Sequence, residues 1–86
     1  MIKWGIIGAG HIAQRFARSL AHSNQGKLYA VASHTVTKLD LFTEEYPGIS
    51  TYTDYMQILE DKNVDVVYIA LRHKDHYKWA KEALLN

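Results

Sequence analysis

The chain has 86 residues, 48% of them hydrophobic and 22% charged, with a formal net charge of +1 at pH 7. This apolar content suits one small packed domain and is too high for a disordered segment. The absence of cysteine excludes disulfide bonds and thiolate metal sites, and the mixed charges indicate neither a nucleic-acid nor a membrane partner. No apolar run approaches the roughly 18 residues that span a bilayer, and no signal-peptide pattern opens the chain, so we expect a cytoplasmic protein.

The first half of the sequence alternates two strand patterns with two helix patterns. Residues 2–7 predict a strand that leads into Gly-x-Gly-x-x-Ala at residues 8–13. Small and apolar residues then recur at helical spacing over residues 12–21. Residues 27–32 predict a second strand, and the spacing of Val36, Leu39 and Phe42 predicts a helix that ends at Pro47.

The second half continues the alternation. Residues 49–52 predict a short strand, Thr53 is a suitable N-cap for the helix that follows, and residues 65–70 predict a fourth strand. A last helix is expected from about residue 75. This order predicts an α/β fold: a partial Rossmann fold whose parallel sheet runs 3-2-1-4, with helices on both faces. The fourth strand would then be an open edge, so we expect a fragment or a truncated product.

The glycine-rich turn after the first strand is the pattern with which βαβ units bind the diphosphate of a dinucleotide. Gly8 would permit the tight turn, and Gly10 would let the diphosphate approach the backbone. The amides of His11 and Ile12 would face the phosphates at the positive end of the helix dipole. The alternative interpretation is a glycine-rich turn that binds no ligand.

The residues after the second strand bear on the choice of cofactor. An Asp or Glu about 20 residues beyond the glycines commonly binds the free ribose 2′-OH of NAD. Here the sequence has Ser33 and His34 at that place, with Lys38 shortly after. Hydroxyl, imidazole and ammonium groups without a carboxylate favour NADP, although NAD remains possible if these are ordinary exposed loop residues.

Several motifs together resemble the N-terminal part of the Gfo/Idh/MocA family of oxidoreductases. They are residues 4–13, 31–34, 52–55 and 61–70, together with His76 and Tyr77. The resemblance implies an NAD(P)-dependent oxidoreductase, with NADP preferred here, that acts on a sugar, polyol or related alcohol and forms a homo-oligomer. It also implies that residues 1–86 are the N-terminal part of the NAD(P)-binding domain, and that the catalytic and substrate domain is absent from this chain. The family's catalytic lysine would lie beyond Asn86, so we expect the chain alone to be inactive.

Two histidines follow the fourth predicted strand, where the family usually has Pro-Asn and then one histidine. Leu71 and Arg72 replace that pair, and the extra His73 resembles the dihydrodiol dehydrogenase branch. The two histidines follow the end of the fourth strand, on the side where a doubly wound fold binds ligands, so His76 and Leu71 would lie near the nicotinamide, and His73 would orient substrate or relay a proton. The alternative is that His76 is a packing residue and His73 an ordinary loop residue. A metal site at the two histidines lacks a third ligand, so we expect no metal.

A second class of function stays open at this point. The chain would then be a non-catalytic module that binds a nucleotide or another subunit. The absent catalytic motif and the uncovered sheet edge favour that alternative.

Overall fold

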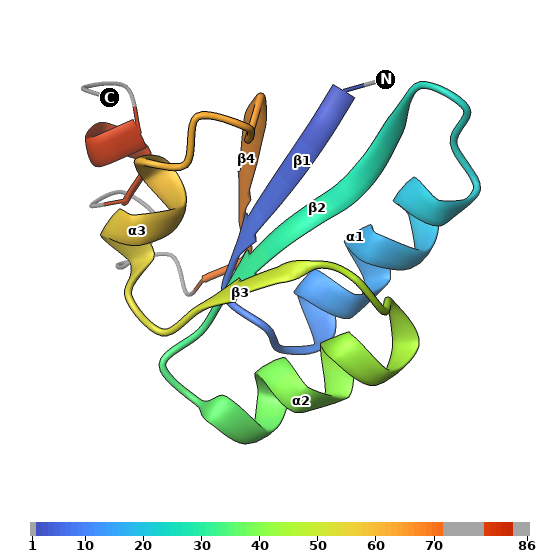
Figure 1. The fold of residues 1–86 in the computed structure, drawn as a ribbon, viewed down its shortest axis with the longest axis horizontal. Coiled ribbons are helices and arrows are strands. Elements are labelled where there is room, and N and C mark those ends of the chain that lie inside the picture. The colour runs from blue at the N-terminus through green and yellow to red at the C-terminus, as the bar shows by residue number, and fades with distance from the viewer. Residues whose placement is uncertain (1, 72–78, 84–86) are drawn as a thin grey trace.

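The computed structural model describes residues 2–71 and 79–83 of the chain (Figure 1). Within residues 2–71, strands and helices alternate along the sequence. The elements are β1 (Ile2–Ile7), α1 (His11–Ala21), β2 (Gly26–Ala32), α2 (Val36–Glu45), β3 (Ser50–Tyr52), α3 (Tyr55–Leu59) and β4 (Val66–Ile69). Residues 79–83 are helical. None of the helices in these ranges is long and apolar enough to cross a membrane.

The four strands form one parallel sheet in the order β3-β2-β1-β4. β1 pairs with β2 from Ile2 opposite Gly26 to Ile7 opposite Ala32, and its pairing with β4 ends at Ile7 opposite Ile69. Because these strands are parallel, their carboxyl ends lie at the same edge of the sheet. The predicted α/β class, strand order and partial Rossmann topology are therefore confirmed.

Helices cover both faces of the sheet, and each face has its own hydrophobic core (Figure 1). On the face of α1 and α2, Ile6 and Val31 pack with Phe42. On the face of α3, Ile7 packs with Tyr55 and Ile58, and Trp79 packs against this cluster. Neighbouring residues of one strand thus enter opposite cores, as the two-residue period of a strand requires.

Backbone hydrogen bonds hold the carboxyl ends of the strands together. The Gly8 amide donates to the Ala32 carbonyl at 2.7 Å, and the Ala70 amide donates to the Ile7 carbonyl at 2.8 Å. The Ser33 amide donates to the Tyr52 carbonyl at 2.9 Å. The loops that follow β1, β2 and β4 therefore start from fixed positions along one edge of the sheet.

The structure differs from the sequence predictions in local detail. Asp54, and not Thr53, is the N-cap of α3, and its carboxylate accepts a hydrogen bond from the Met56 amide at 3.0 Å. The prediction of Thr53 was wrong because Ser, Thr and Asp are all good caps, and packing of Tyr55 and Ile58 sets the register. β4 is shorter than the apolar run that predicts it, and among the described strands it pairs only with β1.

Candidate functional site

Gly8 makes the tight turn between β1 and α1 possible. Its φ is +102°, a conformation that residues with a side chain rarely adopt. A Cβ built on Gly8 would also lie 2.5 Å from the Ala70 carbonyl oxygen. The protein's own backbone therefore requires glycine at this position.

Gly10 is glycine for a different reason. Its φ of −87° is open to any residue, and a Cβ at Gly10 would meet no atom within 4 Å. Packing within the described chain therefore does not require glycine here, and the space beside the backbone is open. An open space at this point of the motif is what a diphosphate approaching the chain would need.

The first turn of α1 offers amide donors beside this open space. The Gln14 amide makes the first helical hydrogen bond, to the Gly10 carbonyl at 3.0 Å. The amides of His11, Ile12 and Ala13 precede that bond, so the helix itself supplies them with no acceptor. They lie at the positive end of the helix dipole, and no acidic side chain occupies this first turn. The arrangement is suited to binding an anion.

A pocket of about 430 Å³ lies between the glycine loop and the loop that follows β2, and we call it the β2-side pocket. It brings together six of the predicted cofactor-binding residues: Gly8, Gly10, Ser33, His34, Lys38 and Leu71. These residues come from the loops after β1, β2 and β4 and from the first turn of α2, and the shared edge of the parallel sheet makes them neighbours.

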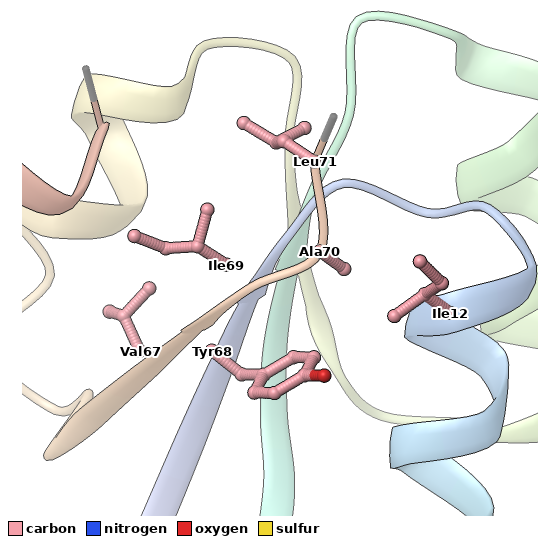
Figure 2. Close-up of a pocket in the computed structure, with 6 residues that line it drawn as sticks. All are labelled: Ile12, Val67, Tyr68, Ile69, Ala70 and Leu71. Atoms are coloured by element: carbon pink, nitrogen blue, oxygen red, sulfur yellow. The ribbon is translucent and has the colours of Figure 1, made fainter. Parts of the chain in front are cut away.

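A second pocket, of about 410 Å³, lies along the end of β4, and we call it the β4-side pocket (Figure 2). It is lined by Ile12 and residues 67–71. Figure 2 shows Ile12 at the start of α1 on the same side of β4 as Tyr68, whereas Val67 and Ile69 point to the other side. Ala70 and Leu71 line both pockets, so the two hollows adjoin beside the glycine loop.

Ser33 shapes the loop after β2. Its side chain is only 4% exposed, and its hydroxyl oxygen accepts a hydrogen bond from the Thr35 amide at 3.0 Å. This hydrogen bond closes a turn in which a serine side chain takes the place of a backbone acceptor. Sequence reasoning gave Ser33 a ligand contact and missed this structural role.

His34 is exposed, and its imidazole stacks on Tyr55 at the first turn of α3. The two ring centroids are 4.1 Å apart and the ring planes are 8° from parallel. Tyr55 is 8% exposed and also makes an edge-on contact with Trp79, at a centroid distance of 5.0 Å. No local sequence pattern indicated that Tyr55 supports His34 in the wall of the β2-side pocket.

Among the described residues, the β2-side pocket has a positively charged lining. Lys38, in the first turn of α2, lines it, and no carboxylate does so among the residues that the structure describes. Thr35 is the N-cap of α2, and its hydroxyl makes no capping hydrogen bond. A cation, a hydroxyl group and a helix N-terminus thus lie where a ribose-binding carboxylate commonly stands.

A tyrosine–carboxylate pair lies behind this loop. The Tyr52 hydroxyl donates to Asp61 Oδ2 at 2.6 Å. This hydrogen bond, with a smaller contribution from burial, raises the pKa of Tyr52 to about 12. The same bond, together with one from the Asn63 amide, lowers the pKa of Asp61. The pair ties the end of β3 to the turn after α3, and the Tyr52 carbonyl in turn accepts the Ser33 amide.

The remaining predicted residues divide into two groups. His11 is the first residue of α1, where its side chain is exposed and lines neither pocket. The amide of His11 lies at the helix N-terminus, and its contact with a diphosphate stays a prediction. His73 and His76 lie outside the described residues. Within residues 2–71 and 79–83, no group of three side chains could hold a metal ion.

Comparisons with known proteins agree with this geometry. Residues 2–86 match the family described as "Oxidoreductase family, NAD-binding Rossmann fold". Trans-1,2-dihydrobenzene-1,2-diol dehydrogenase of Mus musculus is 32% identical over 77 residues, which cover 87% of this chain and 23% of that protein. D-xylose 1-dehydrogenase (NADP(+)) of Hypocrea jecorina is 33% identical over 89 residues, covering 90% of this chain and 23% of that protein.

Two solved structures show the same fold with bound cofactors. A 3-ketoreductase from Actinomadura kijaniata in complex with NADP and TDP-benzene is 33% identical, with a TM-score of 0.88 over 98% of this chain and 26% of that one. Scyllo-inositol dehydrogenase from Lactobacillus casei with NAD(H) and scyllo-inositol is 26% identical, with a TM-score of 0.79 over 96% of this chain and 26% of that one. This chain therefore spans about a quarter of the length of these proteins. It belongs to the oxidoreductase family with the NAD-binding Rossmann fold, in agreement with the resemblance in its sequence motifs.

Proposed function

We propose that this chain is the N-terminal part of the cofactor-binding domain of an NADP-dependent dehydrogenase. The enzyme would transfer a hydride between the nicotinamide and a carbinol carbon of a sugar, polyol or related alcohol. The relatives named above act, by their names, on a diol, a sugar and an inositol. Residues of a second domain would complete the substrate site.

The observation that most strongly supports cofactor binding is the open space at Gly10, beside the first-turn amides of α1. A diphosphate bound there would lie between the two pockets. The adenosine half would then occupy the β2-side pocket, and the nicotinamide half would follow the β4-side pocket past Ile12 and Leu71. The length of a dinucleotide suits two adjoining hollows joined by an anion site.

Preference for NADP follows from the lining of the β2-side pocket. Lys38 supplies a cation, and the described lining has no carboxylate to repel a 2′-phosphate or to bind a free 2′-OH. The 2′-phosphate would lie between Lys38, His34 and the N-terminus of α2. His76 and His73, which come after Leu71 in sequence, are proposed to face the nicotinamide and the substrate.

The test of this proposal uses the complete protein that the gene encodes. Tryptophan fluorescence titrations should show saturable binding of NADPH and weaker binding of NADH. Assays of NADP reduction with a panel of sugars, polyols and diols should then identify substrates. Binding of neither cofactor would contradict the proposal, and binding without turnover of any alcohol would favour a non-catalytic nucleotide-binding module.

We also propose that the complete protein is a cytoplasmic homo-oligomer, as the family resemblance implies. Sedimentation velocity of the purified gene product measures this directly. A single monomeric species at micromolar concentration would contradict the proposed assembly.

A further inference from the structure

An apolar surface remains exposed on the α1 side of β4 (Figure 2). Tyr68 lies on this side, and Val66 shares it because alternate residues of a strand face the same way. Val66 is 38% exposed, and Ile12, at the start of α1 beside this face, is 56% exposed. Large apolar side chains thus meet solvent on a face that a parallel sheet normally buries.

Three aromatic rings continue the core toward this surface. Phe16 of α1 stacks on Tyr68 of β4, with 4.0 Å between the ring centroids and 3° between the ring planes. Trp4 of β1 contacts Phe16 edge-on, at a centroid distance of 5.1 Å. All three side chains are half-buried, and Phe16 and Tyr68 pack against the core on the α1 side. The core on this face therefore extends to β4 without being closed there by the described elements.

A hollow of about 350 Å³ lies between α1 and β4, and we call it the α1–β4 groove. It is lined by Ile12, Arg15, Phe16 and Ser19 of α1 and by Tyr68 of β4. The spacing of three and four residues places the α1 side chains on one face of that helix. Ile12 and Tyr68 also line the β4-side pocket, so the groove adjoins the proposed nicotinamide site.

The handedness of the strand connections explains why this groove is open. α1 and α2 lie on one face of the sheet, where the chain moves from β1 to β2 and β3, and α3 lies on the other face, where the chain returns to β4 (Figure 1). Trp79, in the helical residues 79–83, also packs with the core on the α3 side. Right-handed connections that continue outward from β4 would keep to the α3 side. A cover for the α1 side of β4 therefore has to come from a more distant segment.

We propose that an amphipathic helix of the second domain, in the same polypeptide, packs into the α1–β4 groove. This inference rests on the proposed function, in which a second domain completes the enzyme. This chain spans about a quarter of the length of its relatives, so the rest of such a protein has room for this helix. A helix suits the groove because parallel sheets are covered by helices on both faces. Tethering within one polypeptide favours this occupant over a free partner.

The docked helix would connect the second domain to the cofactor site. Its apolar stripe would pack on Phe16, Tyr68 and Val66, and its end beside Ile12 would close the open side of the β4-side pocket. The groove would thereby fix the position of the second domain, and of the substrate residues it carries, relative to the nicotinamide.

Photocrosslinking in the complete protein identifies the occupant of the groove. Ser19→p-benzoylphenylalanine places the crosslinker at an exposed position in the groove wall. Val36→p-benzoylphenylalanine is the control, because Val36 is 57% exposed at the start of α2 and lines neither the groove nor the β4-side pocket. We expect the Ser19 variant to crosslink within one molecule, to a single later segment with apolar residues at helical spacing. The Val36 variant should not join that segment.

The other outcomes of the crosslinking would overturn the proposal. A band of twice the monomer mass would assign the groove to a second copy of the protein. Crosslinks that stay within residues 1–86, or no crosslinks at all, would mean that no later helix lies in the groove. The measurement needs no cofactor, so a protein that forms the expected crosslink but binds neither NADPH nor NADH would contradict the proposed function alone.

Hydroxyl-radical footprinting of the wild-type protein tests the same cover without a substitution. Val66 and Val36 are 38% and 57% exposed, so the two valines should be oxidised at similar rates if the groove is open. A docked helix that leaves Val66 less than about 5% exposed, as in a protein core, should slow its oxidation about eightfold. Similar oxidation of the two valines in the complete protein would overturn the proposal.

Discussion

The glycine loop at residues 8–10 and the loop after β2 at residues 33–35, which lead into α1 and α2, line one pocket, but they are built in different ways. The glycine loop acts through its backbone: a positive φ at Gly8, an open space at Gly10 and the amides that begin α1. The loop after β2 acts through side chains, with Ser33 holding the turn and His34 lying on Tyr55. The backbone site would bind what NAD and NADP share, and the side-chain site would recognise what distinguishes them.

The largest effect is expected at Gly8. Gly8→Ala places a methyl group against the Ala70 carbonyl in a left-handed conformation, so the free energy of unfolding should fall by about 3 kcal/mol. Gly48→Ala is the matched control, because Gly48 has a φ of +92° but its Cβ would meet nothing within 4 Å. Chemical denaturation should show a smaller loss there, of about 1 kcal/mol. Equal losses would mean that contact with Ala70 is unimportant.

Gly10→Val should separate binding from stability. The side chain fills the space proposed for the diphosphate, so affinity for NADH and NADPH should fall alike, by at least about 100-fold or 2.7 kcal/mol. The free energy of unfolding should change by no more than about 1 kcal/mol, the cost of a poorer N-cap. Ala21→Val, at the exposed far end of α1, serves as the control and should bind normally. Unchanged affinity in Gly10→Val would remove the glycine loop from the site.

Lys38→Gln should change the affinity for NADPH without changing the affinity for NADH. Loss of the cation should weaken NADPH binding about tenfold and leave NADH binding unchanged, because only NADP carries the 2′-phosphate. Lys27→Gln removes the same charge at the amino end of β2, away from this pocket, and should change neither affinity. Parallel losses for both cofactors in Lys38→Gln would show that Lys38 does not distinguish them.

The smallest effect is expected at the hydrogen bond between Tyr52 and Asp61, which lies behind the loop after β2. Because the pKa of Tyr52 is raised to about 12, the stability from its bond to Asp61 is present below pH 10 and is lost as the pH rises through about 12. Because the pKa of Asp61 is lowered, the same bond also weakens in acid. Tyr52 and Asp61 are half-buried at the surface, where solvent screens such a pair, so its contribution should stay below about 1 kcal/mol. Ultraviolet titration should find a tyrosine that ionises near about pH 12 in the wild type, and this late phase should move to lower pH in Asp61→Asn.

The glycine loop could be predicted from sequence because its parts are adjacent. The first strand, Gly8, Gly10 and the start of α1 all fall within one short segment, and each has a local conformational signature. The strand order followed from the alternation of strands and helices and the right-handed crossover. These features are fixed by backbone physics that a short window of sequence contains.

The loop after β2 could be predicted only in part. The sequence located Ser33, His34 and Lys38 at the end of the second strand, but the partner of His34 lies on another helix. A stack between His34 and Tyr55 depends on how α3 packs on the sheet, which no local pattern records. The prediction of the N-cap of α3 was wrong for a similar reason. Thr53 and Asp54 are both good caps, and tertiary packing determines which of them begins the helix.

The central claim is that backbone amides at the start of α1 bind a diphosphate. Amide NMR during titration with NADPH tests it most directly. We predict that the amide resonances of Gly10, His11, Ile12 and Ala13 shift most, and that NADH shifts the same amides. Saturable binding that leaves these four amides unmoved, or no binding of either cofactor to the natural gene product, would contradict it.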